Sequence, residues 1–278
     1  MTAPASTPAT PPFEPGFQRL SALRLILEPR PLSGALNMAR DETLLESVIA
    51  GGPATLRIYR WREPTVSLGY FQAEDDPTLG ERFGGLPQVR RLSGGGALLH
   101  DREVTYSVVC PAEAPFASEP GLLYDAVHAA IVAELNAWGI PARLRGTSLT
   151  GAQPFLCFGR GDPRDIVLAG SKIVGSAQRR RKGAVLQHGA LLLSRSDWAR
   201  EFPGLWDLAP EAAQRLDGLE SRLGGVIASA LSLAWAPGAW RPEEVRDAEA
   251  KERERYSSTR PFVARKSSLQ KQGETPPD

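Results

Sequence analysis

The stretch DIVLAGSKIVGSAQRRRKGAVLQHGALLL, residues 165–193, decides the fold class. Apolar and polar residues alternate on both sides of Gly170-Ser171, and they alternate again on both sides of Lys182-Gly183. A period of two that is interrupted by glycine-containing pairs is typical of antiparallel strands joined by tight turns. We therefore expect a run of hairpin-linked strands at the centre of the protein.

The sequence around this stretch adds further strands and several helices. The helical stretches show apolar residues at helical spacing or capping residues such as Ser196 and Pro242. The segment 55–72 is expected to form two strands joined by a turn at Glu63-Pro64. This mixture with little βαβ alternation indicates an α+β domain whose sheet is largely antiparallel. Strands are expected over 23–29, 55–72 (as two), 104–110 and 142–146, and helices over 34–50, 121–139, 196–202, 219–235 and 243–256.

Composition bounds the class of protein. The chain has 278 residues, of which 42% are hydrophobic, so it can bury a substantial core in one large domain or two small ones. A net charge of +1 argues against a nucleic-acid-binding surface. No run approaches the ~20 apolar residues of a membrane span, and residues 1–16 lack the features of a secretory signal. Two cysteines fit a reducing compartment, and we expect a cytoplasmic protein.

Lys172 and Cys157 are the candidates for catalysis. Small or apolar residues follow Lys172, so we expect a partly desolvated ammonium that attracts polarised groups strongly. Alternatively, Lys172 is an edge-strand lysine that opposes aggregation. Cys157 lies in a loop upstream and is a candidate nucleophile, because a nearby ammonium would stabilise its thiolate. Alternatively, Cys157 is a small buried hydrophobe between Leu156 and Phe158.

A glycine-rich segment, RRLSGGGALLHD at 90–101, forms a second candidate site. Its three glycines allow positive φ and let backbone amides approach carbonyl or phosphate oxygens. The loop is not of the Walker type, because no Lys-Ser/Thr pair follows the glycines; a simple glycine-rich bend is the alternative. His100 at a strand end is more typical of a hydrogen-bonded structural residue than of a base. Cys110 is expected to be a packed residue. His128, in the middle of a helix, is expected to be a packing or a surface residue.

Four segments, in this order along the chain, resemble the lipoate-protein ligase and octanoyltransferase superfamily, and most closely its LipM-type octanoyltransferase branch. An ordered set of this kind is more specific than a single glycine-rich loop. The similarity covers approximately residues 22–265. The segments are NMARDETLL at 37–45, RIYRWREPTVSLGYFQ at 57–72, RRLSGGGALLHDREVTYSVV at 90–109, and CF at 157–158 with GSKIVGSAQRRRKGAVLQHGALLL at 170–193.

The resemblance implies the biotin/lipoate protein ligase fold, with a mixed, largely antiparallel sheet flanked by helices. It places one catalytic domain over 22–265, between disordered ends at 1–21 and 266–278. It would also let some aromatics near the strand ends, Tyr70 and Phe71 among them, line an acyl tunnel. Because aromatics usually serve packing, we favour the core for them.

The implied activity is transfer of an octanoyl group from acyl carrier protein to a lysine of a lipoyl domain, through a thioester on a cysteine. The acceptors would be the lipoyl domains of 2-oxoacid dehydrogenases or the glycine cleavage H protein. No cofactor, metal, nucleic acid or membrane is expected. By resemblance the catalytic residues are Cys157 and Lys172, and the substrate-binding residues are Arg91, Ser93, Gly94, Gly95, Gly96, His100, Gly175, Ser176 and Ala177.

Two alternatives remain at the level of sequence. An ATP-dependent lipoate-protein ligase would use ATP and Mg to form an acyl-adenylate and would need no cysteine. Gly96 favours this ligase, because the octanoyltransferase branch often carries arginine there. Ser171 also departs from the arginine often found before the family lysine, and this departure bears on the local charge assignments. Two features favour the transferase. The first is Cys157, and the second is that the sequence after residue 240 lacks the accessory domain that many ligases append. A non-catalytic acyl-carrier-binding module is opposed by the presence of both Cys157 and Lys172.

The basic run Arg179-Arg180-Arg181-Lys182 is expected to divide between two strand faces and to leave several cations near solvent. Acyl carrier proteins and lipoyl domains are commonly acidic, so this run is a candidate docking surface. The alternative is a solvated hairpin tip that aids solubility.

Overall fold

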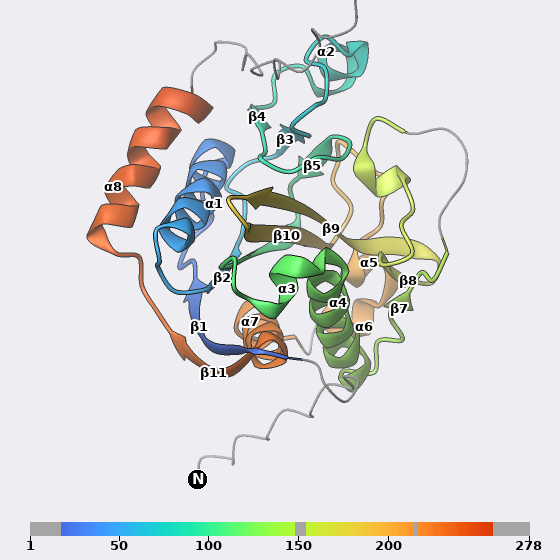
Figure 1. Cartoon of the computed structure of the whole chain (residues 1–278). Helices are drawn as coiled ribbons and strands as arrows, with labels where there is room; N and C mark the ends of the chain where they lie inside the picture. The colour runs from blue at the N-terminus through green and yellow to red at the C-terminus, as the bar shows by residue number, and fades with distance from the viewer. Residues whose placement is uncertain (1–17, 148–153, 214–215, 258–278) are drawn as a thin grey trace, which may run out of the picture.

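The computed structural model describes residues 18–147, 154–213 and 216–257, and an eight-stranded sheet dominates this part of the chain. β1 is parallel to both of its neighbours and the other pairs are antiparallel, so the expected α+β fold with a largely antiparallel sheet is confirmed (Figure 1). The strand order is β11(Ser232–Pro237), β1(Leu20–Leu27), β2(Thr55–Tyr59), β6(Glu103–Cys110), β10(Ala184–Leu192), β9(Ser171–Arg181), β8(Ile166–Leu168) and β7(Arg143–Leu144).

The expected central hairpins are present. Ala169 and Gly170 have φ of 48° and 81°, and Lys182 and Gly183 repeat these values. Positive φ at both central residues defines the type I′ turn, whose twist matches that of the flanking strands. The first turn therefore lies one residue earlier than the alternation of the sequence suggested, and β8, β9 and β10 follow one another as an antiparallel meander.

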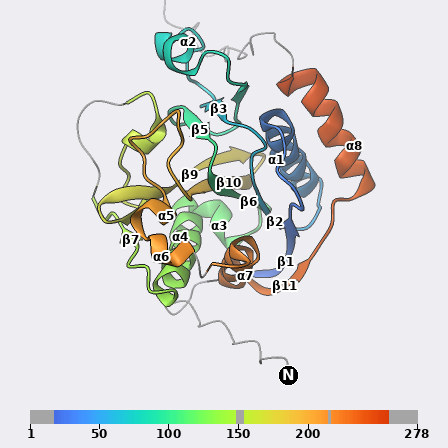
Figure 2. The ribbon, with the colours of Figure 1, turned by 180° about the vertical axis from the view of Figure 1, so that it is seen from behind.

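Helices cover both faces of the sheet (Figures 1 and 2). α4(Pro120–Ala137) and α7(Leu219–Leu231) pack on one face over the main hydrophobic core. α1(Gly34–Ile49) covers the other face, and α8(Pro242–Lys251) packs against α1 and continues as a π-helical turn at Glu252–Tyr256. Ser33 caps α1 by accepting a hydrogen bond from the Leu36 amide at 3.1 Å.

A second, three-stranded sheet carries the glycine-rich segment. Its order is β4(Gln88–Arg90), β3(Thr65–Leu68) and β5(Leu98–His100). The two strands predicted on either side of Glu63-Pro64 thus belong to two different sheets. The remaining short helices are α2(Pro77–Phe83), α3(Pro115–Ser118), α5(Leu205–Leu208) and α6(Pro210–Ala213), with a 3₁₀ turn η1(Cys157–Gly159).

Two expectations about helices are wrong. Residues 196–202 form turns rather than a helix, although Ser196 Oγ does accept from the Trp198 amide at 3.1 Å. The helix expected over 219–235 ends at Leu231, because the next residues pair with β1 as β11 and a tertiary contact overrides local preference.

The predicted tail at 266–278 lies outside the described residues, and so do residues 1–17 of the predicted lead-in. No helix in the described part of the chain has the length and apolar character needed to cross a bilayer.

Candidate active site

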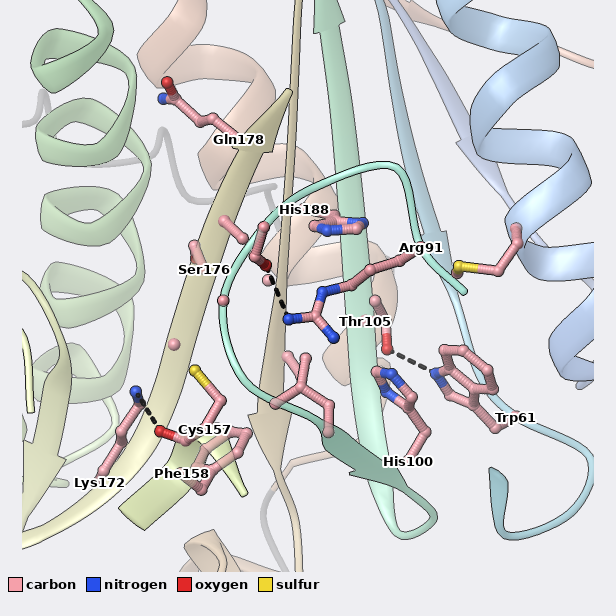
Figure 3. A pocket seen from close by; sticks show the side chains of 18 of the residues that line it. Trp61, Arg91, His100, Thr105, Cys157, Phe158, Lys172, Ser176, Gln178 and His188 are labelled. Atoms are coloured by element: carbon pink, nitrogen blue, oxygen red, sulfur yellow. Dashed lines mark hydrogen bonds between the residues drawn. The ribbon is translucent and has the colours of Figure 1, made fainter. Parts of the chain in front are cut away.

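A cavity of about 320 Å³ lies where the central hairpin meets the glycine-rich loop (Figure 3). Most of the predicted site residues line it, which confirms that segments far apart in the sequence converge here. Ser93 and Gly96 do not line the cavity. The predicted residues that do line it are Arg91, Gly94, Gly95, His100, Cys157, Lys172, Gly175, Ser176 and Ala177.

Cys157 is the first residue of η1 and is partly exposed, whereas Cys110 is fully buried. The Cys157 amide donates to Ala97 O at 2.7 Å, which fastens this segment to the end of the glycine-rich loop. Its Sγ lies 3.8 Å from the position that a Cβ would take on Gly95, so the thiol faces the loop. Burial raises the pKa of the Cys110 thiol to about 12, which makes it unreactive near neutral pH. The packing role expected for Cys110 is confirmed.

Lys172 enters the cavity from the start of β9 with its side chain only 7% exposed, so the expected desolvation is confirmed. Its Nζ lies 2.9 Å from Asp165 Oδ1, 3.4 Å from the carbonyl oxygen of Cys157 and 5.2 Å from the centre of the Phe158 ring. Asp165 is itself 5% exposed and was not identified from the sequence. The only sequence signal for Asp165 is that an acidic residue stands immediately before β8, the strand that pairs with β9.

The glycine-rich loop is held from inside by Arg91. The guanidinium donates to Gly94 O at 2.8 Å and to Gly96 O at 2.6 Å through Nη2, and to Ser67 O at 2.9 Å through Nη1. Gly95 has a φ of +93°, a conformation that favours glycine. The predicted loop is therefore a rigid turn, with its carbonyls bound by an arginine.

Gly96 leaves room for Arg160. A Cβ at Gly96 would lie 2.5 Å from Arg160 Cζ, so the guanidinium occupies the volume into which a residue-96 side chain would extend. Arg160 Nε is anchored on Pro154 O at 2.9 Å. An arginine from the Cys157 segment thus lies where the octanoyltransferase branch often places an arginine on the loop. This weakens Gly96 as support for a ligase.

Two histidines line the inner part of the cavity. His100 stacks on Trp61 with ring centres 3.7 Å apart, and its two nitrogens contact Glu103 and Ser67 at 2.8 and 2.7 Å. The structural role expected for His100 fits these contacts. His188 was not singled out from the sequence. Its Nε2 lies 2.5 Å from Ser93 Oγ, and burial lowers its pKa, so the ring is neutral near pH 7.

His128 on α4 is more than a packing residue. Its Nδ1 lies 2.5 Å from Arg164 O, a group that only accepts, so this nitrogen carries the proton. Nε2 then accepts from Ser176 Oγ at 2.6 Å, and Ser176 contacts the Tyr106 hydroxyl at 2.7 Å. Burial lowers the pKa of His128, which keeps the ring neutral. The chain of hydrogen bonds fixes the Ser176 side chain on the cavity wall.

The aromatic residues divide between core and surface. Trp61 is buried and lines the cavity, and so does Tyr59. The core position favoured for Phe71 is wrong, because its side chain is 83% exposed and makes an edge contact with Tyr70. Neither Tyr70 nor Phe71 lines the cavity.

Sequence comparison identifies relatives with known names. The model of the lipoyl protein ligase A/B catalytic domain matches residues 33–202. The octanoyltransferase LipM of Kyrpidia tusciae is 40% identical over 175 residues, which are 58% of this chain and 62% of the relative. The match therefore spans less than two thirds of that relative. LipM of Carboxydothermus hydrogenoformans is 36% identical over 199 residues, 70% of this chain and 74% of the relative.

Solved structures agree on the fold. The putative lipoate protein ligase Ta0514 from T. acidophilum superposes with a TM-score of 0.64 at 23% identity, covering 86% of this chain and 96% of that one. A lipoate-protein ligase A bound with ATP gives 0.63 at 23% identity, with the same coverage. With more than half of its length matched by the family model, this chain belongs to the lipoyl protein ligase A/B catalytic domain family.

Proposed function

We propose that this protein is an octanoyltransferase, which moves an octanoyl group from acyl carrier protein to a lysine of a lipoyl domain through a thioester on Cys157. The observation that carries the proposal is the partly exposed thiol of Cys157 in a cavity that also holds the buried ammonium of Lys172. The relatives named octanoyltransferase LipM support the same activity. The acceptors would be lipoyl domains of 2-oxoacid dehydrogenases or the glycine cleavage H protein.

The reaction proceeds in two exchanges. The Cys157 thiolate attacks the thioester carbonyl, the carbon–sulfur bond to the carrier breaks, and the carrier thiolate takes a proton from the Lys172 ammonium. The target lysine, as a free amine, then attacks the Cys157 thioester. It loses a proton to the now neutral Lys172, and the Cys157 thiolate leaves as the amide forms. The first exchange replaces one thioester by another, so the acyl group stays activated without ATP.

The geometry suits Lys172 for this proton transfer. Hydrogen-bond contact with Asp165 fixes the ammonium beside the Cys157 segment, and burial keeps bulk water from competing for the proton. A lysine can release a proton and take it back, whereas an arginine stays protonated in proteins. An arginine at position 172 is therefore not expected to replace it.

The test is incubation with octanoyl-carrier protein in the absence of ATP, followed by intact mass measurement. Wild-type protein should gain one octanoyl group, Cys157→Ala should gain none, and Cys110→Ala should acylate normally because its thiol is buried away from the cavity. Retained transfer in Cys157→Ala would show that the nucleophile is misassigned. Acylation that requires free octanoate and ATP would establish a ligase instead.

A further inference from the structure

Arg91 is a buried cation without a counter-ion. Arg91 is 2% exposed, and none of the acidic residues in the described segments forms an ion pair with it. Its contacts within the described part of the chain are to carbonyl oxygens and to the Ser67 hydroxyl, and its Nε has no hydrogen-bond partner there. The nearest carboxylate along its hydrogen bonds is Glu103, reached through Ser67 and His100. Burying an unpaired charge is costly, so an anion that binds beside Arg91 is strongly favoured.

Lys172 differs in this respect. Asp165 lies 2.9 Å from its Nζ, so the ammonium already has a carboxylate in direct contact. An added anion would gain less from a cation that is already paired than from one that is not. Charge balance therefore separates the two cations of the cavity, although both lie near the same thiol.

Arg91 and Cys157 lie on either side of Gly95. The position that a Cβ would take on Gly95 is 3.0 Å from Arg91 Nη2 and 3.8 Å from Cys157 Sγ. Figure 3 shows the guanidinium and the sulfur directed toward the same loop. Because Gly95 has no side chain, the space that a Cβ would fill beside both groups stays open. Burial lowers the pKa of Arg91 to about 10 even though the nearby charge of Cys157 acts in the opposite direction.

We propose that Arg91 is the cation that stabilises the thiolate of Cys157 and the negative charge that develops on the acyl oxygen, whereas Lys172 carries the proton. The proposal rests on the proposed acyl transfer and assigns a separate role to each cation. Arg91 also binds the loop carbonyls, so it fixes the loop in place while its charge faces the thiol.

Other charged or titratable groups surround Cys157, and a test has to separate Arg91 from them. Tyr124 on α4 is uncharged, because burial raises its pKa to about 12. The neutral His128 and His188 contribute no charge. Charged groups in this region include Arg160 on the Cys157 segment itself and Arg90 beside Arg91, and, around the start of β8 and β9, Lys172, Asp165, Asp162, Arg164 and Arg145.

The test is the rate of alkylation of Cys157 by iodoacetamide as a function of pH, followed by peptide mass analysis. Arg91→Gln should raise the midpoint by about one to two pH units, the effect of one opposite charge at close range. Arg91→Lys should shift it less. Lys172→Met combined with Asp165→Asn removes the ion pair without leaving an unpaired carboxylate, and it should leave the midpoint nearly unchanged. The rate at high pH, where the thiolate is fully formed, should be alike in all variants, whereas a disrupted loop would change that plateau.

A second measurement needs only protein with the native Arg91. Iodoacetate is an anion, so the ratio of its rate to that of iodoacetamide should exceed the ratio for free cysteine, and the double variant Lys172→Met with Asp165→Asn should keep the excess. A midpoint that rises in the double variant Lys172→Met with Asp165→Asn and not in Arg91→Gln would overturn the assignment. So would a ratio at or below that of free cysteine. Neither measurement involves acyl transfer, so failure of the octanoyltransferase proposal would be seen separately, in the mass experiment.

Discussion

Gly175→Ala should displace Lys172 by a single methyl group. A Cβ at Gly175 would lie 2.5 Å from Lys172 Cε, 2.9 Å from Nζ and 3.6 Å from Asp165 Oδ1. Ordinary contacts between carbon atoms are about 3.5–4.0 Å, so the end of the lysine has to move by about 1 Å. Gly175 has no positive φ, so the backbone itself accepts alanine. The substitution therefore tests the position of the ammonium while keeping its chemistry.

A misplacement of this size costs about a hundredfold in rate when a proton is transferred between positioned groups. Stability should fall by no more than about 1 kcal/mol, because only the flexible end of one side chain has to yield. The assay is single-turnover transfer of octanoate to a lipoyl domain, with thermal unfolding measured in parallel. Alkylation of Cys157 should keep its pH midpoint, since Arg91 is untouched.

The matched control is Gly80→Ala in α2, where a Cβ meets nothing within 4 Å. That variant should transfer at the wild-type rate. Wild-type transfer by Gly175→Ala would refute the reasoning, because it would mean that the position of Lys172 Nζ does not limit the reaction. A loss in both variants would point to a general effect of the substitution.

Two further predictions follow from burial and from exposure. His128 has a lowered pKa in the folded state, so the unfolded chain binds a proton that the folded chain does not as pH falls below 6.5, and stability is lost in that direction. The loss approaches about 1.4 kcal/mol per pH unit only well below 6.5 and is at most about 1 kcal/mol between pH 6.5 and 5.5, so His128→Asn should reduce the fall in urea-unfolding free energy over that interval by up to this amount. An unchanged slope in the variant would contradict neutral burial of the ring. Arg180 and Lys182 are exposed, so Arg180→Glu with Lys182→Glu should cause a salt-sensitive loss of acylation by octanoyl-carrier protein, while a small thioester still acylates Cys157 normally. Equal losses with both donors would mean that the basic run supports the fold. No loss with either donor would leave the run as a solubility feature.

The sequence was sufficient to predict the central hairpins and the convergence of Cys157 with Lys172. Alternation and glycine-containing turns are local signals, and the ordered segments resemble a known superfamily. Asp165 could not be found in this way, because its contact with Lys172 depends on how β8 pairs with β9. The missing counter-ion of Arg91 is likewise a property of three-dimensional surroundings.

Errors arose where distant contacts override local pattern. The residues after Leu231 continue a helical pattern, yet they form β11 because the edge of β1 is available to them. Phe71 follows a buried strand but is exposed, because the chain turns outward after Gly69. Such outcomes depend on segments far away in the sequence, which periodicity does not report.

The placement of β1 between β2 and β11 has a consequence for synthesis on the ribosome. Arg24 on β1 pairs with Glu244 at 2.8 Å, and Glu42 on α1 accepts from the Tyr256 hydroxyl at 2.8 Å. The amino-terminal segments therefore lack these partners until almost the whole described chain has emerged, and contacts so distant in sequence form slowly. All of the residues assigned to chemistry precede β11. A nascent chain thus carries the complete set of reactive groups, with a free thiol among them, before the last strand of the main sheet has formed.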